Sequence, residues 1–144
     1  MIRMRGDNIA ARLVDFGAAV VTLTRSLPQD RAGKLIVDQL LRSATAGGSN
    51  YEEARSAQSR RDFVHKVSLA AKEMREALYW LGLVARTEPS ATDVASALRK
   101  EGTELVAILM SSAKTARADQ TGNGGQSIRS REPEIGPGNT NREP

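Results

Sequence analysis

The chain has 144 residues and a mass of 15.5 kDa, with 40% hydrophobic residues, which is the size and composition of one ordinary domain. Aromatic residues make up only 3% and argue against an all-β fold, while the absence of cysteine excludes disulfides and thiolate metal sites and fits a reducing cytoplasm. Residues 1–117 hold 18 Lys and Arg against 13 Asp and Glu, a modest positive balance that is compatible with a nucleic-acid partner.

The first half of this region predicts two helices, at residues 7–27 and 31–56. Apolar residues spaced alternately four and three apart form the stripe of the first helix: Ile9, Leu13, Phe16, Val20, Leu23 and Leu27. Pro28 ends that helix, because proline disfavours the helical conformation in the residue before it. The stripe of the second helix contains Leu35, Ile36, Leu40, Ala44, Gly47 and Ala54. Gly47 and Gly48 each cost about 1 kcal/mol relative to Ala in mid-helix, which suggests close approach of another helix.

The second half predicts helices at residues 59–87 and 90–117, with Ser59 and Ser90 as candidate N-caps. The stripe of the third helix is Phe63, Val67, Ala70, Met74, Ala77, Leu81 and Val84, and the fourth carries Val94, Leu98, Leu105, Ile108 and Leu109. Further apolar residues widen the surface of the third helix beyond one face: Leu69, Tyr79, Trp80 and Leu83. Because large exposed apolar patches often mark interfaces, we expect self-association.

Four helices with short connections predict an all-α fold, an antiparallel up-down-up-down four-helix bundle spanning residues 1–117. Residues 118–144 hold five Gly and three Pro but few apolar residues. Such a segment buries too little surface to offset its ordering entropy, so we expect a disordered C-terminal tail.

The sequence predicts no catalytic, cofactor or metal site, and therefore no enzyme. The single histidine, His65, follows Asp62 rather than Glu, so the Glu-x-x-His spacing of di-iron bundles is missing. Gly47-Gly48 lacks the Lys-Ser/Thr of a phosphate-binding loop. No long uncharged apolar stretch follows the first residues, so we expect a cytoplasmic protein without a membrane partner. A bundle enzyme or cofactor binder is the least favoured alternative.

Five polar residues lie close to apolar positions and are candidates for a structural network: Asn50, Glu53, Lys72, Glu76 and Glu101. Lys72 and Glu76 are four residues apart, the spacing of a helical charge pair. Because buried polar groups must be paired, we expect these residues to connect the helices and fix their register. A functional site and simple exposure to solvent are the alternatives.

Basic residues at the start of the third helix, Arg60, Arg61 and Lys66, together with Arg75, are the candidate nucleic-acid contacts. If several chains assembled with these faces together, the charge of each chain would add to a strongly positive surface. Such a surface would contact phosphates without reading bases. Ordinary solvated helix faces are the alternative interpretation.

Two long segments resemble signatures of a known family. Residues 39–54, QLLRSATAGGSNYEEA, resemble the helix-two signature of the bacterial four helix bundle protein family, also called the 23S ribosomal RNA intervening-sequence protein family. Residues 59–66, SRRDFVHK, with Lys72-Glu73 and residues 76–81, EALYWL, are similar to its second signature, and residues 104–115 are similar to its ending. The chain departs from the usual pattern at residues 46–48, where a Ser-Ile-Gly arrangement is commoner.

The resemblance, which covers roughly residues 9–117, implies an antiparallel bundle that assembles into a ring-like homopentamer. Related members include the accessory variability protein of diversity-generating retroelements, a basic pentamer that associates with a reverse transcriptase and with nucleic acid. Other members are encoded within intervening sequences of 23S rRNA genes. The expected partners are therefore further copies of the chain, RNA or DNA, and a reverse transcriptase. A protein–protein adaptor without nucleic-acid binding is the first alternative.

Overall fold

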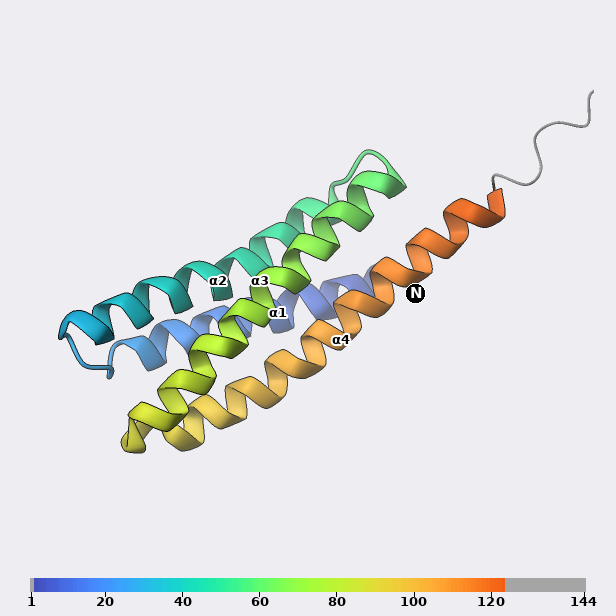
Figure 1. Cartoon of the computed structure of the whole chain (residues 1–144). Coiled ribbons are helices and arrows are strands. Elements are labelled where there is room, and N and C mark those ends of the chain that lie inside the picture. Colours follow the sequence, from blue (N-terminus) through green and yellow to red (C-terminus); the bar gives the residue numbers. More distant parts are fainter. Residues whose placement is uncertain (1, 124–144) are drawn as a thin grey trace, which may run out of the picture.

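The chain folds into four long helices that pack side by side. The computed structural model describes residues 2–123, with side chains described for residues 6–122. The helices are α1 (Ile2–Thr24), α2 (Arg31–Arg55), α3 (Arg60–Thr87) and α4 (Thr92–Asn123), and a single 3₁₀ turn, η1 (Pro89–Ala91), precedes α4. Each helix runs antiparallel to the one before it, so the connections alternate between the two ends of the molecule (Figure 1). The predicted all-α, up-down-up-down four-helix bundle is confirmed.

The helix ends differ from the predicted ends by a few residues. The first helix ends at Thr24, and Arg25, Ser26 and Leu27 then form successive turn hydrogen bonds to carbonyls three residues back. At the other terminus α4 continues through Asn123, six residues beyond the predicted boundary. Of the expected tail, residues 118–123 are therefore helical, and residues 124–144 lie outside the described part of the chain.

Side-chain caps define two of the helix starts. The hydroxyl oxygen of Ser59 accepts the backbone N–H of Asp62 at 3.0 Å, which confirms the predicted cap of α3. Asp30 caps α2 in the same way by accepting the N–H of Gly33 at 2.8 Å. The prediction for α4 was wrong, because Ser90 lies inside the 3₁₀ turn and the helix begins at Thr92.

The core lies along the predicted stripes, with α3 at its centre. The α3 helix packs along both α2 and α4, whereas α1 packs on α2 and less extensively on α4. All six predicted stripe residues of α1 are buried, as are six of the seven in α3. Two residues that were predicted to belong to the buried stripes, Leu35 of α2 and Val94 of α4, are instead 55% and 51% exposed, so these two predictions were wrong. Each lies on the solvent side of the first turns of its helix, where Gly33 of α2 and Ala95 of α4 are the buried residues. Within residues 2–123 no helix is long and apolar enough to cross a membrane.

The two central glycines of α2 face different helices at different distances. A Cβ atom on Gly47 would lie 2.6 Å from Sδ and 2.7 Å from Cγ of Met74, which is fully buried on α3. A Cβ atom on Gly48 would meet Leu13 of α1 at 3.7 Å, an ordinary van der Waals contact. The close helix contact that the sequence suggested is therefore confirmed at Gly47, where α2 can approach Met74 of α3 because glycine has no Cβ atom.

These two positions predict opposite effects of the same substitution. Gly48→Ala should raise the free energy of unfolding by about 0.5–1 kcal/mol, because alanine favours the helix and meets no clash. Gly47→Ala gains the same helix propensity but overpacks Met74, so its net effect should be a loss of roughly 1–2 kcal/mol. Urea denaturation of both variants measures this difference. Equal stabilisation by both substitutions would contradict the tight packing of α2 on α3.

Candidate nucleic-acid interface

Charged side chains meet across every boundary between neighbouring helices. Between α1 and α4, the Arg12 guanidinium donates to both carboxylate oxygens of Glu101, at 2.9 and 3.0 Å, and lies 3.2 Å from Glu104. This bidentate contact holds the pKa of the Glu101 carboxyl below its ordinary value, although partial burial opposes the shift. The pair thus connects the first and last helices at mid-length.

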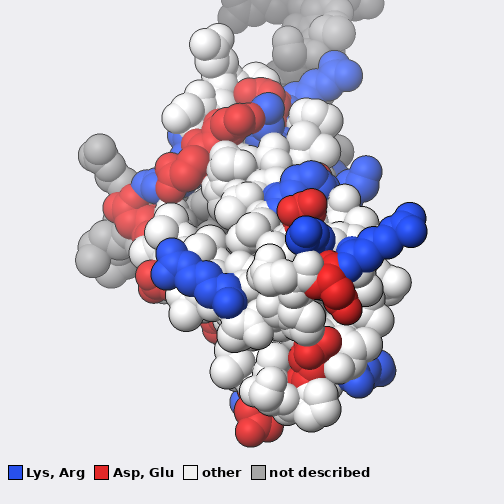
Figure 2. All heavy atoms as spheres, turned by 90° about the vertical axis from the view of Figure 1, so that its left-hand side faces the viewer, with Lys and Arg blue, Asp and Glu red and all other residues white. Residues whose placement is uncertain are grey.

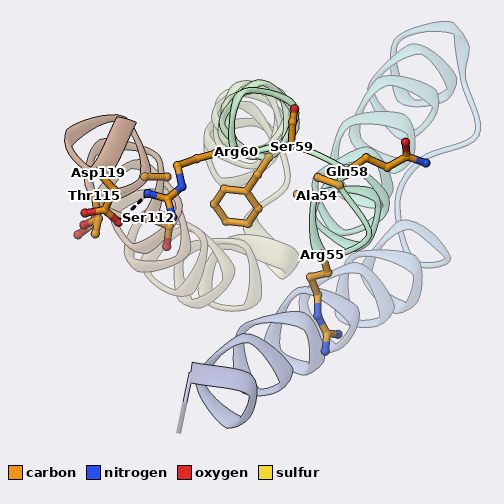
Figure 3. Close-up of a pocket in the computed structure, with 12 residues that line it drawn as sticks. Ala54, Arg55, Gln58, Ser59, Arg60, Ser112, Thr115 and Asp119 are labelled. Carbon is orange, nitrogen blue, oxygen red and sulfur yellow. Dashed lines mark ion pairs between the residues drawn. The ribbon is translucent and has the colours of Figure 1, made fainter. Parts of the chain in front are cut away.

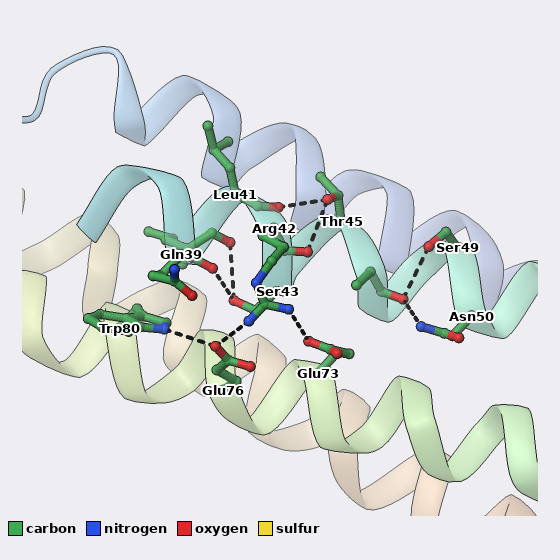
Figure 4. Close-up of polar contacts among 12 residues, drawn as sticks. Gln39, Leu41, Arg42, Ser43, Thr45, Ser49, Asn50, Glu73, Glu76 and Trp80 are labelled. Carbon is green, nitrogen blue, oxygen red and sulfur yellow. Dashed lines mark hydrogen bonds and ion pairs between the residues drawn. The ribbon is translucent and has the colours of Figure 1, made fainter. Parts of the chain in front are cut away.

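The boundary between α2 and α3 contains two such pairs. Arg42 reaches from α2 to Glu73 at 3.1 Å and to Glu76, as Figure 4 shows. The same Glu76 oxygen accepts a long hydrogen bond, 3.5 Å, from the indole N–H of Trp80. These contacts lower the pKa of the Glu76 carboxyl, and the hydrogen bond from Arg42 contributes most to this shift. The second pair joins Lys66 of α3 to Glu53 of α2 at 2.5 Å.

The remaining two boundaries are bridged near the end of the bundle where both termini lie. Arg55 of α2 pairs with Asp7 of α1, and Arg60 of α3 pairs with Asp119 of α4 at 3.3 Å. Figure 3 shows Arg60 reaching toward α4 while Arg55 turns toward α1. Between these arginines lies a groove of about 720 Å³ formed by the end of α2, the start of α3 and the last turns of α4.

The five residues predicted to form one structural polar network do not form a connected network in the structure. Glu53, Glu76 and Glu101 each pair with a residue on another helix, but at three different places. Two expectations were wrong. The Asn50 amide donates to the carbonyl of Ala46 in its own helix, at 2.9 Å, and does not reach another helix. Lys72 is exposed and forms no ion pair with Glu76, which pairs with Arg42 instead, although the charge of Lys72 helps to lower the pKa of that carboxyl.

A different set of residues forms a continuous surface on α3. Positions three or four residues apart, out of phase with the buried stripe, lie on the outward side of the helix. We call this set the outer stripe; its members are Arg61, His65, Ser68, Lys72, Arg75, Tyr79, Leu83 and Arg86. All are exposed except Ser68 and Leu83, which are partly covered, and Tyr79 is 63% exposed.

The outer stripe carries cations without carboxylates. None of the acidic residues of α3, which are Asp62, Glu73 and Glu76, falls at a stripe position, and the last two face α2. Within the described side chains, no carboxylate forms an ion pair with the four basic members of the stripe: Arg61, Lys72, Arg75 and Arg86. Arg117 of α4 adds a further guanidinium at its edge by donating to the Ser68 hydroxyl at 3.2 Å.

The structure therefore separates the four predicted nucleic-acid contacts into two groups. Arg61 and Arg75 are exposed on the outer stripe, whereas Arg60 and Lys66 are occupied by Asp119 and Glu53. The outer stripe also contains Lys72, Arg86 and Tyr79, which the predicted contacts did not include, although the spacing of the stripe in the sequence could have identified them. Figure 2 provides a contrast, because acidic and basic side chains alternate on the end of the molecule that it views.

The described residues offer little to hold a metal or a buried ligand. Residues 2–123 contain no cluster of three or more His, Asp or Glu side chains arranged to hold an ion. Every buried side-chain nitrogen or oxygen in the described region has a hydrogen-bond partner.

The apolar surplus predicted for α3 is smaller in the structure than in the sequence. Leu69, Trp80 and Leu83 are each partly buried, and Trp80 packs against the core. Tyr79 remains exposed, with its ring edge-on to Trp80 at a centroid distance of 5.0 Å. The aromatic contribution of α3 to the surface is thus concentrated in one oriented tyrosine.

Comparisons with known proteins identify the family of the chain and support its fold. The sequence matches the model of the 23S rRNA-intervening sequence protein family over residues 8–111, which includes the whole outer stripe. The crystal structure of a protein of unknown function from the S23 ribosomal protein family of Bacteroides thetaiotaomicron is similar, with 33% sequence identity and a TM-score of 0.69. That match covers 76% of this chain and 97% of the other. No curated protein matches the chain.

The Arg12–Glu101 contact predicts a pH-dependent contribution to stability. Because the pKa of Glu101 is lowered by folding, its stabilising effect is full above the unfolded-state value, about 4.3, and is lost as the pH falls through the folded-state value. Arg12→Gln should lower the melting temperature at pH 7 by a few degrees, since a partly exposed pair contributes at most about 1 kcal/mol.

Thermal denaturation at pH 7 and pH 3 measures this effect. The difference between wild type and Arg12→Gln should shrink at pH 3, because the stabilising effect of the pair is progressively lost below the unfolded-state pKa of Glu101. Arg25→Gln, which removes an exposed arginine just beyond the end of the same helix, should change the melting temperature little at either pH. A deficit of equal size at both pH values would show that packing of the Arg12 side chain, not its charge, is what stabilises the fold.

Proposed function

The chain belongs to the 23S rRNA-intervening sequence protein family, and we propose that it acts without catalysis as a self-assembling bundle that holds nucleic acid on the outer stripe of α3. The observation that carries this proposal is the distribution of charge. Carboxylates and cations neutralise each other between the helices, while Arg61, Lys72, Arg75 and Arg86 are left together on one surface.

The dimensions of this surface suit a polyanion. From Arg61 to Arg86 the helix rises about 37 Å at 1.5 Å per residue, close to the length of one turn of duplex. A single exposed pair of opposite charges gains only about 1 kcal/mol at 4 Å in water and is screened within about 8 Å at physiological salt. Several cations acting on neighbouring phosphates release counterions together, and that collective gain supports binding without sequence specificity.

Self-assembly would strengthen the same effect, because every added copy brings another outer stripe. Among the described side chains, four large hydrophobic residues, one on each helix, are exposed and offer apolar surface for contacts between copies: Val14, Leu35, Tyr79 and Val94. The alternative function is a protein–protein adaptor, with a reverse transcriptase as a candidate partner. It becomes the better account if the protein fails to bind nucleic acid.

A comparison of two double variants tests the assignment to the outer stripe. Arg61→Gln with Arg75→Gln removes two unpaired cations from the stripe, whereas Arg60→Gln with Lys66→Gln removes two cations that already have carboxylate partners. The first variant should weaken binding to DNA and RNA similarly across sequences and reduce the salt-dependence slope by about 1 to 2. The second should bind much like wild type.

Fluorescence anisotropy titrations between 50 and 200 mM salt measure both quantities. Equal losses in the two double variants would mean that net charge, not the outer stripe, determines binding. Absence of binding by wild type at 50 mM salt would refute the nucleic-acid function and favour the adaptor.

Self-assembly is tested separately from nucleic-acid binding. Light scattering coupled to gel filtration at micromolar concentration should report a species several times heavier than the 15.5 kDa chain, with a pentamer expected from the family resemblance. A single species of 15.5 kDa would contradict self-assembly and leave each outer stripe to act alone.

A further inference from the structure

A small cleft at one end of the outer stripe combines two arginines with an aromatic ring, which nonspecific electrostatic binding alone does not require. It lies between α3 and α4, has a volume of about 290 Å³, and is lined by Leu78, Tyr79, Gly82, Leu83, Arg86 and Arg99. We call it the arginine cleft. Its lining includes two cations, one aromatic ring and no acidic residue.

Both guanidinium groups of the arginine cleft converge on the same buried glycine. A Cβ atom on Gly82 would lie 3.3 Å from Cζ of Arg99 and 3.4 Å from Nη1 of Arg86. Arg86 is further fixed by donating from Nη1 to the carbonyl oxygen of Gly82 at 2.9 Å. The absence of a side chain at Gly82 therefore lets two positive groups from different helices approach one point.

This arrangement is unfavourable on its own and suits an anion. Two like charges held close together repel, and within the described side chains neither Arg86 nor Arg99 has a carboxylate partner. Each guanidinium presents five N–H donors, of which the structure uses one on Arg86. A phosphate with two free oxygens matches such paired planar donors in charge and in geometry.

The neighbouring tyrosine indicates which phosphate compound would bind. Tyr79 lines the same cleft and is 63% exposed, and its ring is oriented by a T-shaped contact with Trp80, with an interplanar angle of 79°. Trp80 is itself held by Glu76, which Arg42 of α2 contacts (Figure 4). An exposed, oriented ring beside a phosphate site can stack on the base of an unpaired nucleotide, whereas the bases of a duplex are already stacked on each other.

We propose that Arg86 and Arg99 together bind one phosphate of single-stranded nucleic acid while Tyr79 stacks on the adjacent base. This inference rests on the proposed function, since it assigns a specific subsite to the surface that holds nucleic acid. It also adds a preference for single strands, which the charge of the outer stripe alone does not create.

Titrations with fluorescein-labelled 20-nucleotide oligo-dT, oligo-rU and a 20-base-pair duplex test the subsite at 50 mM salt. Arg86→Gln with Arg99→Gln should weaken single-strand binding about tenfold. The matched control, Arg31→Gln with Lys34→Gln, removes the same charge from exposed positions at the start of α2 and should weaken it less than threefold. Circular dichroism of each variant confirms that the fold is retained.

Two further variants leave the charge unchanged. Tyr79→Ala should weaken oligo-dT and oligo-rU binding at least about fivefold, the lower range for stacking of one base, while duplex binding stays the same and Tyr79→Phe behaves like wild type.

The outcomes separate this inference from the function on which it rests. If wild type binds but Tyr79→Ala matches it on single strands, or if Arg86→Gln with Arg99→Gln matches the charge control, the arginine cleft is not a subsite and the proposed function stands. If wild type binds none of the three probes, the proposed function itself fails. Equal loss of single-strand and duplex binding in Tyr79→Ala would also overturn the stacking role.

Discussion

Pairing of opposite charges between neighbouring helices is the interaction on which the surface of this bundle depends. Arg12, Arg42, Arg55 and Arg60 each reach across to a carboxylate on another helix, and Lys66 does the same. These exposed or half-exposed pairs add little to stability individually. Their larger consequence is that Glu73 and Glu76 of α3 face α2, away from the cations on the outward side of the helix.

The position of α3 in the fold explains why this surface forms there. The helix packs on α2 along one flank and on α4 along the other, so its buried stripe and its acidic flank are both fixed by neighbours. Its remaining side faces outward along the whole length of the helix (Figure 1). The packing of α3 on α4 brings Arg99 beside Arg86 and Arg117 beside Ser68, which extends the basic surface onto a second helix.

Most of the fold could be predicted from the sequence because its signals are local. Apolar spacing identified every helix, Ser59 identified one cap, and Gly47 identified a close helix contact. The site was less predictable, because a charge pair depends on which helices are neighbours. Spacing within α3 favoured a pair between Lys72 and Glu76, but Arg42 from α2 takes that carboxylate, and Arg60 is likewise neutralised by the last turns of α4. The outer stripe was detectable in principle, since it is the complement of the apolar stripe in the same helix.

Footprinting of lysines in the unmodified protein tests the central claim most directly. Lys72 lies on the outer stripe, Lys34 lies at the start of α2, and Lys66 pairs with Glu53 between α2 and α3. Acetylation followed by mass spectrometry, with and without saturating oligo-dT, reports the accessibility of each amine in one experiment. The account predicts that the oligonucleotide lowers the reactivity of Lys72 several-fold and leaves Lys34 and Lys66 nearly unchanged. Protection of all three lysines alike, or an unprotected Lys72 in the bound protein, would contradict it.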